Sequence, residues 1–397
     1  MMRALWWTVV VTAFFLLSPL ELVFPQGLFS LVPDPLAGSR VFGAKGCVKC
    51  HAVNDVGGKV GPDLGRTLHP RSFYDLAAAM WNHLPRMVEQ MRQHGISRPR
   101  LTPQETADLI AFLFTLHYFD PPGNLQVGQQ LFLEKKCVVC HQVGGTGGVI
   151  GPNLDFLKQY GSPIFVAAAM WNHGPAMIEA MRAKGIERPT FQERELLDLI
   201  AYLRSASPTL VEGPLYVLPG RAEEGRKLFA EKRCLDCHSV GGQGGRVGPD
   251  LMERRLHQSL MAFSAALWNK APAMLEAMTR LGISPPQIQP EEMADLVAYL
   301  NFMHYFAVSA DPLQGRRLAM DGGCLGCHRL HGEGGTLAGD LARIKGLDSP
   351  AAVLSALWNH SAIGLQENQR WKVSWPQFQP EEMAHIVAFL QSLGWAQ

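Results

Sequence analysis

The sequence predicts an all-α protein made of four similar helical domains in tandem. Its eight cysteines occur only as Cys-x-x-Cys pairs, which recur at intervals of 90, 97 and 90 residues. Helix-capping residues recur at constant distances after each pair, and no segment has the alternating pattern of a strand. Such a repeat divides the 397 residues into an N-terminal segment and four small domains. The expected boundaries are 1–36, 37–122, 123–212, 213–309 and 310–397.

The N-terminal segment is expected to be a membrane anchor. Arg3 precedes a largely apolar run from Ala4 to about Phe24, which approaches the roughly 20 residues that cross a bilayer. No small-x-small cleavage site follows promptly, which favours a retained single-pass helix over the alternative, a cleaved secretion signal. Either interpretation places the rest of the chain in the periplasm, on the outer side of the cytoplasmic membrane.

Each domain is predicted to contain three main helices. The first helix precedes the cysteine pair and carries a glycine: Gly38, Gly128, Gly225 and Gly315. The second helix begins at a serine N-cap: Ser72, Ser162, Ser259 and Ser349. The last, strongly apolar helix begins at a cap closed by a glutamate: Glu105, Glu195, Glu292 and Glu382. Glycine-rich stretches such as 144–148 and 241–245 are expected to be loops between the first two helices.

The spacing between the second and third cysteine pairs is longer than the other two. The extra residues fall in 205–220, a stretch that contains proline and glycine. We expect this stretch to be a linker that separates two pairs of domains.

The charge composition gives no indication of a nucleic-acid partner. Lys and Arg total 36 against 35 Asp and Glu, and no basic run occurs. With 47% hydrophobic residues, the chain is also not a disordered charged tail.

The chemistry is carried by the cysteine pairs together with the residue that follows each pair. The cysteines are Cys47, Cys50, Cys137, Cys140, Cys234, Cys237, Cys324 and Cys327, and the residues that follow the pairs are His51, His141, His238 and His328. Cys-x-x-Cys-His is the attachment signature of c-type haem, in which both thiols bond to the porphyrin and the histidine ligates the iron. Structural zinc would need four ligands at one ion, whereas these pairs lie in separate units. Disulfide pairs would leave the histidines unexplained. Four covalently bound haem c groups are therefore expected.

With these motifs, residues 37–397 resemble four tandem copies of the class I cytochrome c family. The resemblance also rests on Gly128 and Phe132 before the second motif, and on a Gly-Pro pair ten residues after three of the histidines (Gly61-Pro62, Gly151-Pro152, Gly248-Pro249). It implies that the glycine and aromatic of the first helix pack against the last helix. It also implies that the proline carbonyl accepts a hydrogen bond from the proximal histidine in the first three domains.

The family resemblance further implies a distal methionine in a segment of the form Asn-x-x-x-x-Met after the middle helix. Three domains fit this form and place Met87, Met177 and Met274 at 36 residues after their histidines. A second set, one helical turn further on, competes with them: Met91, Met181 and Met278. Whichever set does not ligate iron is expected to pack in the core. His83 and His173 are expected to meet a haem propionate or to cap a helix that begins at Pro85 and Pro175.

The fourth domain departs from this pattern. Gly364 and Asn368 replace the two methionines, and Ala338-Gly339 replaces Gly-Pro. His360 is then the nearest plausible ligand, which predicts a bis-histidine haem with a lower potential than the other three. The alternative is an open iron that binds a small molecule.

These features predict electron transfer rather than catalysis. We expect a tetrahaem cytochrome that acts as a tethered mediator, or as the cytochrome subunit of a respiratory or photosynthetic membrane complex. Its partners would be redox proteins or other subunits of that complex. The alternative is a multihaem oxidoreductase with a small-molecule site at the fourth haem.

Overall fold

The computed structural model describes residues 31, 33–67, 72–116, 123–156, 162–206, 220–253, 259–306, 309–371 and 374–394. Of the predicted anchor segment, 1–36, residues 1–30 and 32 lie outside these ranges, and its last two residues already belong to the first helix, which begins at Pro35. Within them, no helix combines the length and the apolar character needed to cross a bilayer.

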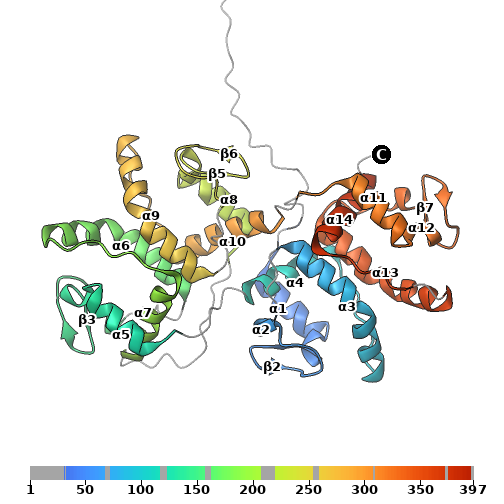
Figure 1. Cartoon of the computed structure of the whole chain (residues 1–397), viewed down its shortest axis with the longest axis horizontal. Helices are drawn as coiled ribbons and strands as arrows, with labels where there is room; N and C mark the ends of the chain where they lie inside the picture. Colours follow the sequence, from blue (N-terminus) through green and yellow to red (C-terminus); the bar gives the residue numbers. More distant parts are fainter. Residues whose placement is uncertain are drawn as a thin grey trace, which may run out of the picture.

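Each domain has a short first helix, a single helical turn at the cysteine pair, a small hairpin, a long middle helix and a last helix (Figure 1). Domain 1 consists of α1 (Pro35–Ala44), β1 (Ala52–Val53), β2 (Val56–Gly57), α2 (Leu64–Thr67), α3 (Phe73–Gln93) and α4 (Pro103–Thr115). Domain 2 consists of α5 (Leu125–Glu134), β3 (Gln142–Val143), β4 (Thr146–Gly147), α6 (Pro163–Ala183) and α7 (Glu193–Ala206). Domain 3 consists of α8 (Ala222–Glu231), β5 (Ser239–Val240), β6 (Gln243–Gly244), α9 (Leu260–Arg280) and α10 (Pro290–Phe306). Domain 4 consists of α11 (Pro312–Asp321), α12 (Cys324–Cys327), β7 (Arg329–Leu330), β8 (Glu333–Gly334), α13 (Pro350–Trp371) and α14 (Pro380–Gly394).

The all-α prediction is confirmed, with one addition. Each domain contains one antiparallel pair of two-residue strands directly after the motif. A strand of two residues is too short to produce a sequence pattern, so these hairpins were not predicted.

The first and last helices of each domain cross in close contact at the predicted glycine. A Cβ atom added to Gly128 would lie only 1.9 Å from the main-chain oxygen of Asp198 on α7. Next to this crossing, the Phe132 and Tyr202 rings lie 5.6 Å apart. The same contact between two aromatic rings occurs in domains 1 and 3. In domain 4 the glycine, Gly315, is equally close to the last helix, and the buried Ala319 occupies the position of the first aromatic residue. The packing that the family resemblance implied is therefore present.

The predicted caps are confirmed with one exception. All four glutamates accept the hydrogen bond that closes the cap of the last helix, and three of the four serines accept a main-chain N–H at the middle helix. The side chain of Ser162 makes no such bond. Instead, the Phe165 N–H donates to the Ser162 carbonyl, at 3.1 Å, and the buried Ser162 hydroxyl has no hydrogen-bond partner among the described residues.

The expectation that a helix begins at Pro85 and at Pro175 is wrong. Both prolines lie inside continuous helices, α3 and α6. A proline inside a helix leaves the carbonyl four residues earlier without its usual donor. At Pro85 that carbonyl belongs to Trp81, and it accepts a hydrogen bond of 3.0 Å from Nε1 of Trp375 in domain 4. The lost helical bond is thus replaced by a bond from another domain.

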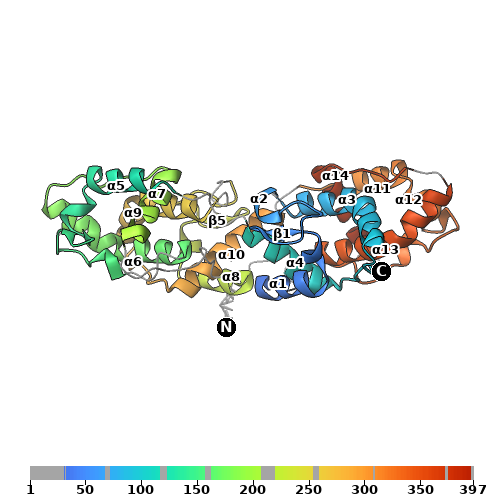
Figure 2. The same ribbon diagram turned by 90° about the horizontal axis from the view of Figure 1, so that it is seen from below.

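The domains pair in an order that differs from the chain order. Domain 2 packs against domain 3 through α6 and α9, and domain 1 packs against domain 4 through α3, α4, α13 and α14. Figures 1 and 2 show domains 2 and 3 in one half of the molecule and domains 1 and 4 in the other. Phe73 of domain 1 stacks on Phe306 of domain 3, at 5.1 Å between ring centroids, and joins the halves. The expectation that residues 205–220 separate two pairs is therefore wrong, because the domains on either side form one pair.

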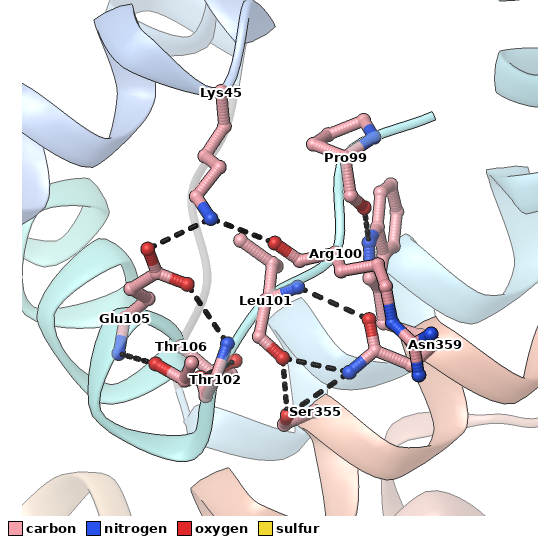
Figure 3. A network of polar contacts seen from close by, with 10 residues as sticks. Lys45, Pro99, Arg100, Leu101, Thr102, Glu105, Thr106, Ser355 and Asn359 are labelled. Carbon is pink, nitrogen blue, oxygen red and sulfur yellow. Dashed lines mark hydrogen bonds and ion pairs between the residues drawn. The ribbon is translucent and has the colours of Figure 1, made fainter. Parts of the chain in front are cut away.

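A Trp-Asn dipeptide on the middle helix of every domain makes the same three hydrogen bonds to its partner. We call this set the Trp-Asn clasp. In domain 4, Trp358 Nε1 donates to the Pro99 carbonyl at 2.8 Å. The amide of Asn359 donates to the Leu101 carbonyl at 2.7 Å and accepts from the Leu101 N–H at 3.0 Å (Figure 3).

The clasps are reciprocal, so each pair of domains contains two of them. Trp81 and Asn82 of domain 1 bind Pro376 and Phe378 of domain 4 in the same way. In the other pair, Trp171 and Asn172 bind Pro286 and Ile288, and Trp268 and Asn269 bind Pro189 and Phe191. The clasps therefore connect the same domains that pack against each other.

Candidate haem sites

The histidine of each motif is held in one orientation by a main-chain carbonyl. The Nδ1 atoms of His51, His141 and His238 lie 3.0, 2.9 and 3.0 Å from the carbonyl oxygens of Pro62, Pro152 and Pro249. Because a carbonyl oxygen only accepts, Nδ1 carries the proton in each ring, and the lone pair of Nε2 is available to a metal. The hydrogen bond that the family resemblance implied is therefore present in domains 1 to 3.

Domain 4 keeps this bond without the proline. His328 Nδ1 lies 2.8 Å from the carbonyl oxygen of Gly339. The bond uses only the backbone, so the loss of Gly-Pro did not remove it. The proximal histidine of domain 4 is therefore held as in the other domains, although the two residues of the loop that holds it differ.

None of the eight motif cysteines is in a disulfide, so both sulfurs of each pair can form the thioether bonds of a haem c. Burial raises the pKa of the first thiol of each motif, to about 11 for Cys47 and Cys137 and to about 12 for Cys234. The pKa of Cys324 is raised for the same reason. In the part of the chain that the structure describes, no three His, Cys, Asp or Glu side chains are grouped as a metal cluster would require.

In domain 2 the motif borders an apolar cavity of about 570 Å³, within the usual range for a cofactor pocket. Cys137, Cys140 and His141 lie on one side of it, and Phe132, Leu199 and Ile200 are among its apolar lining residues. This combination of two thiols, an oriented imidazole and an apolar cavity fits a covalently attached haem. Such a group would supply an iron that cycles between Fe(III) and Fe(II).

Three residues of α6 that the sequence analysis singled out line the same cavity. They are His173, Met177 and Met181, which are spaced four residues apart on α6 and therefore share one face of the helix. The predicted ligand Met177 and its competitor Met181 are thus both brought to the site. His173 does not cap a helix as expected, because its Nδ1 bonds to the Ala169 carbonyl of the same helix at 2.9 Å.

In domains 1 and 3 the methionines are partly buried. Met87 and Met91 lie on α3 and, like Cys47, pack against the core that domains 1 and 4 share, while Met274 and Met278 lie on α9 and, like Cys234, pack against the core that domains 2 and 3 share. In domain 1, His83 bonds to the Ala79 carbonyl within its own helix, at 2.9 Å, as His173 does in domain 2.

In domain 4 the structure brings the proximal histidine and the predicted distal histidine together. The ring centroids of His328 and His360 lie 5.3 Å apart, with the rings inclined by 58°. Burial lowers the pKa of His360, and the neighbouring His328 and Arg98 lower it further. A lowered pKa favours the neutral imidazole, which is the form that binds a metal.

The partner-binding role of the Trp-Asn dipeptide was not predicted from the sequence. Asn82, Asn172 and Asn269 were expected only to begin the methionine segment, whereas their amides bind the neighbouring domain. A signal was available, because Trp358-Asn359 is retained in the fourth domain, where both methionines are replaced. A proline also recurs 48 residues after every motif histidine: Pro99, Pro189, Pro286 and Pro376.

The fold and the four sites define a multihaem c-type cytochrome, a protein that transfers electrons. The family model described as Cytochrome c matches residues 36–117, 125–207, 222–303 and 313–394. The chain therefore belongs to the cytochrome c family, as four tandem domains that together bind four haem c groups. No curated protein and no solved structure matches the chain.

Proposed function

We propose that this cytochrome works on the periplasmic side of the cytoplasmic membrane, tethered by its N-terminal segment. It would carry electrons between a quinol- or substrate-oxidising component and an outer acceptor, either as a mediator or as a subunit of a membrane complex. The observation that carries this proposal is the repetition of one redox site in four domains, each with an oriented proximal histidine.

The location is supported by the sequence of the N-terminal segment. Arg3 followed by an apolar run is typical of an exported or anchored chain. Fractionation of the cells and N-terminal sequencing of the mature protein test the tether. We expect the protein in the membrane fraction with its N-terminal run intact, whereas a mature start near residue 30 would show that the run is a removed signal.

We also propose that His360 is the distal ligand of the fourth haem. The supporting geometry is the close approach of its ring to His328, the proximal histidine of the same domain. A bis-histidine iron has a lower potential than a His/Met iron, because a methionine ligand raises it. This haem would differ in potential from any of the other three that has a methionine ligand.

Spectra of the His360→Ala variant test this assignment. We expect one haem of four to change from low spin to high spin and to gain the ability to bind carbon monoxide. His331→Asn is the matched control, because His331 lies in the same domain with a positive φ of 53° that asparagine tolerates. An unchanged low-spin signal in His360→Ala would remove His360 from the ligand set.

The alternative function, a small-molecule site at the fourth haem, needs an open coordination position. A histidine already facing His328 disfavours it. Binding of cyanide or carbon monoxide to the wild-type fourth haem, without loss of His360, would revive this alternative.

A further inference from the structure

One wall of the haem cavity of domain 2 is supplied by domain 3. Trp268 lies on α9 of domain 3, yet its side chain lines the cavity that also contains Cys137 and His141. The residue is only 2% exposed. Its Nε1 donates at 2.8 Å to the carbonyl of Pro189, another residue of the cavity wall.

The indole is fixed from several directions by domain 2. The Arg188 guanidinium lies over the ring, 4.0 Å from its centroid, and also donates a hydrogen bond to the Trp268 carbonyl. The Phe191 ring lies 6.0 Å away. Proline at position 272 leaves that carbonyl without its helical donor, so the arginine fills a vacant hydrogen-bonding position. The tryptophan is thus held as a part of the neighbouring domain.

The reciprocal tryptophan has a matching environment. Trp171 of domain 2 is 8% exposed and belongs to the core cluster that contains Phe229 and Tyr299 of domain 3. Its Nε1 donates to the Pro286 carbonyl of domain 3 at 2.8 Å. The exchange is therefore mutual, and each domain of the pair completes the interior of the other.

We propose that the clasp tryptophans are positioning residues for the haem of the partner domain. On this proposal the functional unit is the reciprocal pair, domain 2 with domain 3 and domain 1 with domain 4, rather than the single domain. A buried aromatic wall excludes water from the cavity, and the burial of a haem is one of the factors that set its potential. Trp268 therefore influences the haem held by Cys137 and Cys140, although it belongs to the domain that carries the next motif.

The test uses the full-length, haem-loaded protein and two variants of one clasp. Trp268→Phe keeps an aromatic ring but removes the Nε1–H and part of the cavity wall. Asn269→Ala removes two hydrogen bonds of the same clasp and adds no charge, and Asn269 itself does not line the cavity. Glu276→Gln, on the exposed side of α9 and ion-paired with Arg280, is the control. Haem methyl signals in paramagnetic NMR, assigned to domains through contacts to nearby side chains such as Phe132, give four separate redox titrations.

We expect Trp268→Phe to shift the reduction equilibrium of the domain 2 haem on the order of tenfold, which is 59 mV for a one-electron couple. The reduction equilibrium of the domain 3 haem in this variant, and those of all haems in Asn269→Ala and Glu276→Gln, should shift much less. A shift confined to domain 3, no shift at all, or equal shifts in Trp268→Phe and Asn269→Ala would overturn the proposal. Equal shifts would mean that only the pairing of the domains matters.

Discussion

One of the two Trp-Asn clasps between domains 1 and 4 can be weakened with a single substitution, Asn359→Ala, which removes two of its three hydrogen bonds. Leu101 is only 4% exposed, and the Asn359 side chain accepts the hydrogen bond of its N–H at 3.0 Å. The Leu101 carbonyl keeps a second partner, because the Ser355 hydroxyl donates to it at 2.8 Å (Figure 3). The main consequence of Asn359→Ala is therefore one buried, unpaired N–H group.

Such an orphaned donor costs about 1–3 kcal/mol. Because about 1.4 kcal/mol corresponds to a factor of ten, we expect the Leu101 amide to exchange its hydrogen roughly 5 to 150 times faster in the variant. Native-state hydrogen exchange measures this directly, without assuming that a chain of four domains unfolds in one step.

The second pair of domains provides an internal control in the same sample. The Phe191 amide donates to Asn269 at 2.9 Å in the equivalent clasp and should exchange as in the wild type. The reasoning would be refuted by an unchanged rate at Leu101, or by an equal acceleration at Phe191.

Two further predictions concern stability. Gly225→Ala would place a Cβ atom 1.9 Å from the carbonyl oxygen of Asp295. We expect this overpacking to lower the free energy of unfolding of domain 3 by about 1–3 kcal/mol, so that the NMR signals of domain 3 are lost at a lower temperature. An unchanged melting temperature would contradict the close helix crossing. Burial opposes the charge of Glu292, but the Lys232 ammonium and the Gln289 N–H outweigh it, so its pKa lies below the ordinary value of 4.5. The cap at Glu292 is then fully stabilising above that value and weakens as the pH falls through the lower folded pKa. Lys232→Met should move this acid transition to higher pH in an acid titration of the folded protein, and an unmoved transition would assign the lowered pKa to other groups.

Local features of the fold could be predicted from the sequence because they depend on neighbours in the chain. The glutamate caps are set by residues three positions apart, as Gln192 and Glu195 show. The close helix crossing at the glycine was implied by the family resemblance. Its physical reason is that a Cβ atom on Gly128 would lie only 1.9 Å from the main-chain oxygen of Asp198. The motif histidines are oriented by carbonyls only 11 residues away.

The pairing of the domains could not be predicted in the same way, because it depends on surfaces that lie far apart in the chain. Asn359 and Leu101 are separated by 258 positions, and no periodicity connects them. The long linker at 205–220 suggested a division at the middle of the chain, although linker length limits only how far two domains can separate. Which domains pack together depends on how well their surfaces fit, including the hydrogen-bond donors and acceptors that each domain presents to its partner.

The proline inside the middle helix contributes to the same contact between domains as the Trp-Asn clasp. Proline at a helix interior usually costs about 3 kcal/mol, partly because one carbonyl loses its donor. In α3 the carbonyl of Trp81 is freed in this way and accepts from Trp375 of domain 4, and in α9 the carbonyl of Trp268 accepts from Arg188 of domain 2. In both helices the tryptophan whose carbonyl is freed is the one that enters the clasp. Docking of the partner domain therefore offsets part of the free-energy cost of the proline, because it supplies the missing donor. An isolated domain bears the whole cost, so the proline favours the paired state over the separate domains.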